Sequence, residues 1–124
     1  MTVVRTAVVL VATSLLAACS PSSYNLELRN NTTENIRVEM KAQKGNEAPT
    51  LAASAPMYPG QNITLFTQAD KDAKVQVEAR VQGDDKSPPA VRKIILGLSK
   101  LIVNPNPEAA KDPSKARLKI DEQK

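Results

Sequence analysis

The residues able to do chemistry are few in this chain of 124 residues, which has no histidine and a single cysteine, Cys19. Without histidine, the chain cannot build a Ser-His or Cys-His nucleophile pair or a Cys/His zinc site. A lone cysteine also excludes a disulfide within the chain. Only carboxylates, lysines and hydroxyl groups remain, so we expect no enzyme activity, no metal and no cofactor.

Two pairs of acidic residues are the remaining candidates for acid–base or calcium chemistry. Asp70 and Asp72 flank a lysine, and Asp84 and Asp85 follow a glycine. Aspartate is common in turns because its side chain accepts hydrogen bonds from nearby backbone N–H groups. The spacing also matches no EF-hand loop. We therefore interpret both pairs as turn residues.

The cysteine follows an apolar segment at the start of the chain. Arg5 supplies a positive charge, residues 8–16 are mostly apolar, and small residues come next. This order is typical of a secretory signal peptide. The apolar run is shorter than the roughly 20 residues that a membrane-spanning helix needs. It also lacks the regularly spaced polar residues of an amphipathic helix. We predict that residues 1–18 are a signal peptide and are removed.

The residues at the predicted cleavage point, Leu16, Ala17, Ala18 and Cys19, resemble the lipobox of bacterial lipoproteins. The resemblance implies cleavage between Ala18 and Cys19, a diacylglycerol on the Cys19 thiol and an acyl chain on the new amino terminus. Several acyl chains attach a protein lastingly to a membrane, whereas one chain is marginal. The alternative is an ordinary signal peptide with a cysteine near its cleavage point.

The residue after the cysteine bears on sorting between membranes. In Gram-negative lipoproteins an aspartate there favours the inner membrane, and this chain has Ser20. The resemblance therefore implies lipid anchoring at the outer membrane, with the domain on the periplasmic face. Residues 19–23 are rich in serine and are predicted to form a short lipidated tether, and residues 24–124 to form the domain.

Charge and composition argue against a nucleic-acid partner. The net charge is only +4, and basic residues alternate with acidic ones, as in Arg37, Glu39 and Lys41. Nucleic-acid binding requires a concentrated basic surface, often with aromatic side chains on which bases stack. The chain has two tyrosines, one phenylalanine and no tryptophan. We expect no binding to nucleic acid.

Alternating apolar and polar residues after the tether predict a mainly β domain. The alternation covers residues 25–29, 35–43, 62–67, 74–82 and 116–121. Short, half-buried strands separated by turn residues indicate a small antiparallel β-sandwich, immunoglobulin-like or transthyretin-like. The turn cluster at residues 30–35 further predicts that residues 24–43 form a β-hairpin.

Residues 89–103 fit two interpretations. A short helix is favoured by the spacing of the apolar residues, which are Val91, Ile94, Ile95, Leu98, Leu101 and Ile102. Gly97 and the β-branched residues around it favour two strands bent at the glycine. We favour a strand for residues 91–96 and leave the rest open. The segment is expected to complete the core, with docking to a partner or membrane surface as the alternative. A Pro-rich exposed loop is predicted for residues 104–114.

A lipid-anchored sandwich without catalytic groups is expected to bind or scaffold other proteins. The order of segments over residues 57–122, behind a lipobox, resembles the small outer-membrane lipoprotein of type VI secretion systems. That family has a transthyretin-like sandwich and anchors an envelope-spanning complex, so the resemblance implies a subunit of a cell-envelope complex with a protein partner. The chain lacks the insertion that the family carries early in its sandwich. The alternative is a periplasmic protective lipoprotein, either an immunity protein or an inhibitor of a toxin or cell-wall hydrolase.

Overall fold

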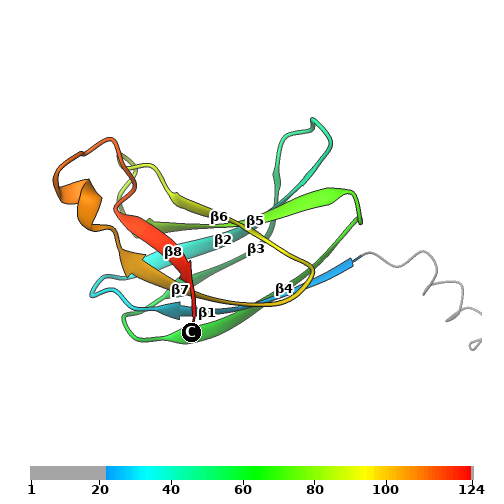
Figure 1. The fold of residues 1–124 in the computed structure, drawn as a ribbon, viewed down its shortest axis with the longest axis horizontal. Helices are drawn as coiled ribbons and strands as arrows, with labels where there is room; N and C mark the ends of the chain where they lie inside the picture. The colour runs from blue at the N-terminus through cyan, green and yellow to red at the C-terminus, as the bar shows by residue number, and fades with distance from the viewer. Residues whose placement is uncertain (1–21, 124) are drawn as a thin grey trace, which may run out of the picture.

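Residues 22–123 are described by a computed structural model and form two four-stranded β-sheets packed face to face (Figure 1). The elements in chain order are β1 (Ser22–Asn30), β2 (Ile36–Lys44), β3 (Thr50–Met57), β4 (Asn62–Ala69), β5 (Ala73–Val81), β6 (Ala90–Ile94), β7 (Gly97–Pro105), the 3-10 helix η1 (Pro107–Ala110) and β8 (Leu118–Glu122). One sheet has the order β4-β1-β7-β8 and the other β3-β2-β5-β6. The prediction of a small, mainly β sandwich is confirmed.

The core lies between the two sheets and follows the alternation in the sequence. From Val75 to Val81 in β5 every second residue is buried, while the residues between them are partly exposed. The largest fully buried apolar side chains come from both sheets and are Leu26, Leu28, Ile36, Met40 and Met57. Full burial of such a side chain stabilises the fold by about 1.5–3 kcal/mol. The apolar face of each strand thus holds the two sheets together.

The first two strands do not form the hairpin predicted for residues 24–43. β1 pairs with β4 and, in parallel, with β7, whereas β2 pairs with β3 and β5 in the other sheet. Residues 31–35 therefore carry the chain across from one sheet to the other. The hairpin prediction is wrong because a sheet-to-sheet crossing uses the same turn residues as a hairpin, and only the long-range partners distinguish the two.

The helix considered within residues 89–103 is also wrong, and the two-strand alternative is confirmed. β6 and β7 are joined by residues 95–96, and Gly97 has a φ of +86°, which side-chain-bearing residues rarely adopt. The helical spacing arose because buried and exposed apolar residues are mixed in this segment. Ile94 and Leu101 are buried, whereas Ile95 and Leu98 are exposed.

Two elements were not predicted from the sequence. β3 is rich in alanine and contains Pro56, and only Met57 of its residues is buried. It is an edge strand, a place where proline is tolerated because the edge has free hydrogen-bonding positions. The helix η1 lies within the predicted loop of residues 104–114, and β7 extends into that loop as far as Pro105.

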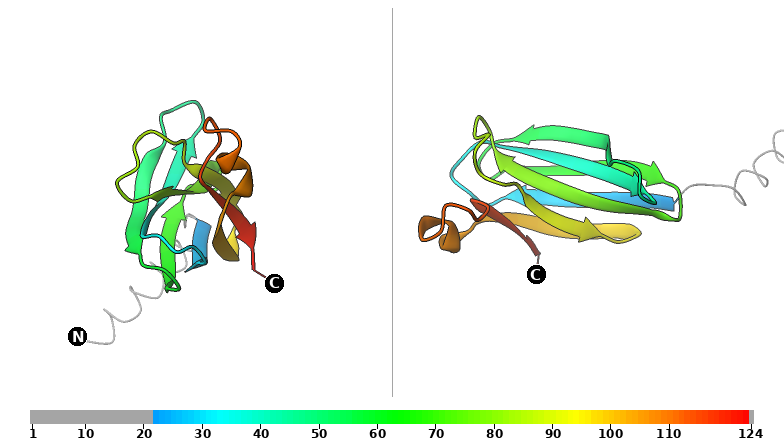
Figure 2. Two further views of the ribbon diagram at one scale, coloured as in Figure 1. Left: turned by 90° about the vertical axis from the view of Figure 1, so that its left-hand side faces the viewer. Right: turned by 90° about the horizontal axis from the view of Figure 1, so that it is seen from above.

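The sandwich has two ends with different connections. The start of β1 lies at one end, here called the proximal end, together with the connections at residues 45–49, 70–72 and 95–96. The connections at residues 31–35, 58–61, 82–89 and 106–117 lie at the opposite, distal end (Figure 2). β1 starts at Ser22, within the predicted tether, and its nine residues span about 30 Å at about 3.3 Å each.

Candidate functional site: the distal loops

Asn30 is the buried polar centre of the distal end. Its side-chain nitrogen donates to the backbone oxygens of Glu34 at 2.9 Å and Met57 at 3.3 Å. Its side-chain oxygen accepts from the backbone N–H of Thr32 at 3.0 Å and from the Thr32 hydroxyl at 2.7 Å. Asn30 is fully buried, so these bonds replace the water that the amide loses on folding. The amide therefore fixes the course of residues 31–35.

The backbone around Asn30 is tied to two further segments. The Asn30 N–H donates to the oxygen of Gln61, and the Asn30 oxygen accepts from the N–H of Gly60 at 2.8 Å. The Asn31 N–H donates to the oxygen of Val103 in β7 at 2.9 Å. The connection at residues 31–35 is thus held from several sides, and a loop held in this way presents its exposed side chains in a fixed arrangement.

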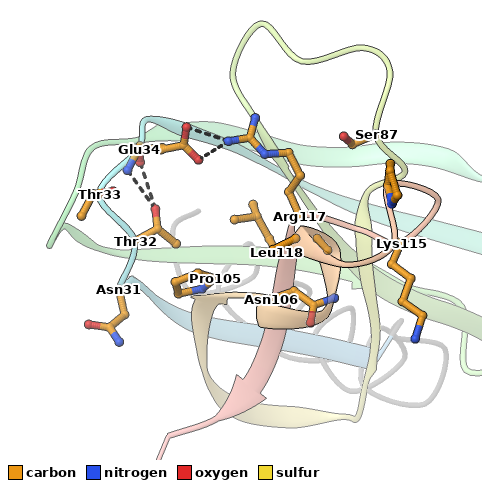
Figure 3. Close-up of a pocket in the computed structure, with 13 residues that line it drawn as sticks. Asn31, Thr32, Thr33, Glu34, Ser87, Pro105, Asn106, Lys115, Arg117 and Leu118 are labelled. Atoms are coloured by element: carbon orange, nitrogen blue, oxygen red, sulfur yellow. Dashed lines mark hydrogen bonds and ion pairs between the residues drawn. The ribbon is translucent and has the colours of Figure 1, made fainter.

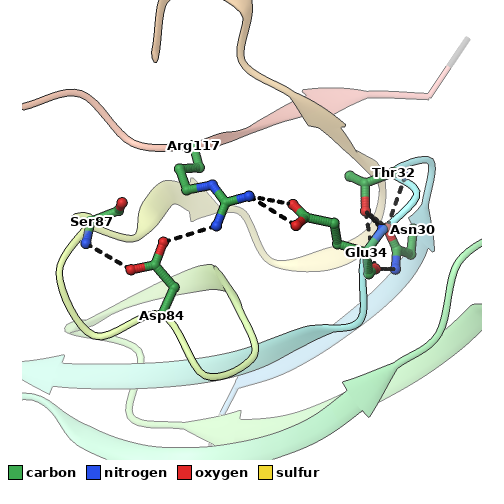
Figure 4. Close-up of polar contacts among 6 residues, drawn as sticks. All are labelled: Asn30, Thr32, Glu34, Asp84, Ser87 and Arg117. Atoms are coloured by element: carbon green, nitrogen blue, oxygen red, sulfur yellow. Dashed lines mark hydrogen bonds and ion pairs between the residues drawn. The ribbon is translucent and has the colours of Figure 1, made fainter. Parts of the chain in front are cut away.

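Arg117 joins three parts of the distal end that are far apart in sequence (Figure 4). Its Nη2 donates to both carboxylate oxygens of Glu34 at 2.8 Å, and its Nη1 donates to Asp84 Oδ2 at 3.1 Å. Asp84 in turn accepts from the backbone N–H groups of Lys86 and Ser87, at 3.0 and 3.1 Å. One guanidinium therefore connects the residues before β8 to the β1–β2 and β5–β6 connections.

These bonds hold the pKa of the Asp84 carboxyl well below its ordinary range. The largest cause is the bond from the Ser87 backbone N–H, followed by the bond from Arg117. The same contacts raise the pKa of Arg117, through Asp84 first and then Glu34. Donors stabilise a carboxylate and so favour its ionised form. Asp84 therefore remains charged and serves as a hydrogen-bond acceptor.

An open hollow of about 470 Å³ lies beside this cluster, between the β1–β2 connection and the loop that carries η1. Figure 3 shows the Arg117 guanidinium meeting the Glu34 carboxylate among the lining residues. Small apolar residues of the loop, Ala109, Ala110 and Pro113, line it as well. Asn106 closes the base of this loop, because its side chain donates to the oxygen of Ala116 at 2.9 Å and caps η1.

Each basic side chain that lines the hollow is paired with at least one carboxylate. Arg117 is paired with Glu34 and Asp84, and Lys115 is paired with Glu108 at 3.0 Å. A general acid at neutral pH requires a carboxyl pKa raised toward 7, and Asp84 has the opposite shift. Because Arg117 and Lys115 are already paired with carboxylates, neither is available as an unpaired cation for a small anion.

The sequence-predicted site residues are dispersed. The lipobox residues Leu16, Ala17, Ala18 and Cys19, and Ser20 after them, lie outside the described residues 22–123. In the first acidic pair, Asp70 forms a salt bridge with Lys44 at 2.8 Å. Asp72 is exposed in the same proximal turn. Of the second pair, Asp84 belongs to the distal cluster and Asp85 is exposed. The two pairs lie at opposite ends of the sandwich and form no joint site.

The described part of the chain contains neither a grouping of metal ligands nor a membrane-spanning helix. Among residues 22–123, no three Asp, Glu or Cys side chains are grouped so that they could hold a metal ion. In the same range no helix has the length and apolar character needed to cross a membrane.

The sequence analysis missed the residues that organise the distal end. The sequence does contain an indication that Asn30 is buried, because Asn30 continues the alternation that places Leu26 and Leu28 on the inward face of β1. A polar residue at an inward strand position is expected to have specific hydrogen-bond partners. Arg117 had no such signal, since its two carboxylate partners lie 33 and 83 positions away.

Comparison with known proteins finds a likeness in fold and none in sequence. No protein-family model matches the chain, and no curated protein matches it in sequence. The fold is similar to an NMR structure of a protein from Eubacterium rectale, with 12% sequence identity, coverage of 83% of this chain and 90% of that one, and a TM-score of 0.47.

Proposed function

We propose that this protein is a lipid-anchored binding module of the bacterial cell envelope. It would serve as an accessory or structural subunit of a secretion-type complex, attached through acyl chains on Cys19 to the periplasmic face of the outer membrane. Its protein partner would dock on the distal loops around Arg117. The lipobox resemblance supports the anchor, and the architecture of the sandwich supports the position of the partner.

The observation that carries the proposal is that the sandwich has its chain entry and its loop cluster at opposite ends. Ser22, the first residue of β1, is three residues after Cys19. β1 then runs about 30 Å to the distal end. An acyl anchor at Cys19 would hold the proximal end at the lipid surface and direct the distal loops toward the periplasm.

The distal loops have the properties of a docking surface. Asn30 and Arg117 hold four connections in a defined arrangement. Arginine, tyrosine and other amphipathic side chains are enriched in protein interfaces, and Tyr58 at this end is 62% exposed. Rigid loops limit the conformational entropy that is lost when a partner binds.

The architecture agrees with the family analogy in one respect and departs from it in another. The two packed sheets, β4-β1-β7-β8 and β3-β2-β5-β6, form a sandwich, as the resemblance to the type VI secretion lipoprotein implies. Only residues 31–35 separate β1 from β2, so no inserted segment lies there. A partner would therefore contact the short distal loops themselves.

The test of the anchor is metabolic labelling in bacteria. Wild-type protein should incorporate labelled palmitate, and Cys19→Ala should abolish incorporation and leave precursor uncut. If the wild-type protein takes up no palmitate, the lipid-anchored interpretation is wrong.

The test of the partner surface is site-specific photo-crosslinking in living cells. A crosslinking residue at Thr33 in the distal loops is compared with one at Thr64, which is equally a threonine and exposed on β4. Crosslinks from Thr33 alone to subunits of an envelope complex support the proposal. A single crosslinked toxin or hydrolase that loses its activity on binding supports the protective lipoprotein instead. Equal crosslinking at both positions would show that the distal loops are not the docking surface.

A further inference from the structure

The connection between β6 and β7 exposes three large apolar side chains. Ile95 is 73% exposed, and Leu96 and Leu98 are each 54% exposed. Their neighbours Ile94 and Leu101 are buried at 8% and 3% exposure. The segment therefore completes the core on both sides while its middle, here called the apolar tip (Ile95, Leu96 and Leu98), faces outward. Such a cluster indicates a contact with another apolar phase.

The apolar tip lies at the proximal end, beside the entry of the chain. Gly97, in the middle of the tip, is the partner of Tyr24 in the parallel pairing of β1 and β7, and Tyr24 is two residues after Ser22. Figures 1 and 2 show this connection, in yellow, on the same side of the sandwich as the start of β1, in blue.

We infer that the apolar tip contacts the lipid surface to which the chain is anchored, with Ile95 and Leu96 entering the interfacial region. This inference rests on the anchor in the proposed function. The link from Cys19 to Ser22 spans at most about 11 Å, because each extended residue covers about 3.6 Å at most. A domain held so closely must place part of its proximal end against the bilayer.

The charges beside the tip suit a lipid surface. The segment from Lys93 to Lys100 contains no acidic residue. Lys93 and Lys100 are both exposed. The Lys100 ammonium group lies 3.7 Å from a carboxylate oxygen of Glu27. Lysine side chains can place the ammonium group among lipid phosphates while their carbon chains follow neighbouring apolar groups inward. Apolar side chains beside basic ones are also found in amphipathic elements that lie at membrane interfaces.

The position of the tip favours lipid over a protein occupant. A second copy or a partner at the apolar tip would have to fit between the proximal end and the bilayer, within the short reach of the tether. The distal end carries the paired charges and the ordered loops, and it is free of this constraint. In this arrangement the proximal end contacts lipid and the distal end contacts a protein partner.

The experiment measures the depth of the tip in vesicles that carry the lipidated protein. With Cys19 blocked by its lipid, Leu96→Cys supplies a single free thiol for an environment-sensitive fluorophore, and Tyr58→Cys at the distal end is the matched control. The vesicles contain phosphatidylethanolamine and phosphatidylglycerol, with brominated lipid as the quencher. We expect blue-shifted emission and several-fold stronger quenching at position 96 than at position 58.

A further variant tests whether the apolar side chains cause the insertion. Ile95→Asp and Leu98→Asp together should bring quenching at position 96 down to the level at position 58, with the thermal unfolding midpoint unchanged within a few degrees because both side chains are exposed. Persistence of strong quenching in this folded variant would overturn the role of the tip.

The outcomes separate this inference from the proposed function. Palmitate incorporation with equal quenching at both positions overturns the inference and leaves the anchor standing. Blue-shifted emission at position 96 without quenching by brominated lipid indicates burial against a protein or a second copy, and it also overturns the inference. Absence of palmitate overturns the anchor, and the inference falls with it.

Discussion

Arg117 Nη2 lies 2.8 Å from both carboxylate oxygens of Glu34, although the two residues are 83 positions apart in the chain. The pair joins the loop just before β8 to the connection that crosses between the sheets. Each of the two side chains is 42% exposed, and exposed ion pairs contribute about 0–1 kcal/mol to stability. The importance of the pair therefore lies in how it positions the distal loops.

Arg117→Ala should change the loops more than it changes global stability. We expect the free energy of unfolding to fall by about 1 kcal/mol or less, with faster amide exchange in residues 31–35 and 82–89. The pKa of Asp84, measured by NMR titration, should rise but stay below its ordinary value, because the larger contribution from the Ser87 backbone N–H remains.

The control for this variant is Lys115→Ala. It removes an ion pair with Glu108 in the η1 loop and does not touch Asp84. Its Asp84 titration should match the wild type. An unchanged Asp84 pKa in Arg117→Ala would contradict the role assigned to the guanidinium.

The free energy of unfolding should fall at acidic pH as Asp84 becomes protonated. Its pKa is lowered in the folded protein from an ordinary value of 3.8, so below that pH the unfolded chain binds a proton that the folded protein does not. The resulting stabilisation is fully present above about pH 4 and is lost as the pH falls through the folded-state pKa. Urea unfolding at a series of acidic pH values should show this loss.

Asp84→Asn is the matched comparison for the pH series. Its amide oxygen can still accept from the N–H groups of Lys86 and Ser87, but the titrating charge is gone. The variant should lose less stability than the wild type between about pH 4 and pH 2. Asp112 is also held in its ionised form by Ser114, so part of the slope will remain. Equal slopes in the two proteins would contradict the assignment.

The sandwich was predictable because burial follows the alternation of apolar and polar residues. In β5 the inward positions Val75, Val77 and Ala79 are all buried. The pattern encodes which face of a strand is buried but not which strand is its neighbour. For this reason the hairpin of residues 24–43 was wrong, since the partners of β1 are β4 and β7.

The distal site was less predictable than the fold. The bond of Arg117 to Glu34 depends on the packing of the whole sandwich, and no local pattern encodes it. The apolar tip was ambiguous for a related reason. Apolar residues that face outward, such as Ile95 and Leu98, have the same composition as core residues and gave a false helical spacing. Their exposure becomes visible only when the sheets are in place.

Gly97→Ala tests the bend between β6 and β7. Gly97 has a φ of +86°, and no atom beyond its chain neighbours lies within 4 Å of an added Cβ. The cost is therefore one of backbone conformation, about 1–2 kcal/mol, measured by urea unfolding. Gly97→Asn should cost less, because asparagine tolerates positive φ better than alanine. An alanine variant as stable as the wild type would show that the bend does not depend on this glycine.

Asn30→Ala should be the most destabilising polar substitution at the distal end. It removes the Asn30 donor from the buried backbone oxygen of Met57, leaves the Glu34 oxygen with the Thr32 hydroxyl as its remaining side-chain donor, and deprives that hydroxyl of its closest acceptor. Unsatisfied buried groups cost about 1–3 kcal/mol each, and partial relaxation or entry of water lowers the sum. We expect a loss of about 2–3 kcal/mol in the free energy of unfolding, measured by urea denaturation. Thr33→Ala, at an exposed position in the same connection, should stay within about 0.5 kcal/mol of the wild type.

Asn30→Asp adds a second test, because it keeps the shape but turns a carboxylate toward two carbonyl oxygens. Burial should raise its pKa in the folded protein, so this variant should be penalised at neutral pH and should recover stability as the pH falls toward 4. If Asn30→Ala matched Thr33→Ala in stability, the buried amide could not be what holds the crossing between the sheets.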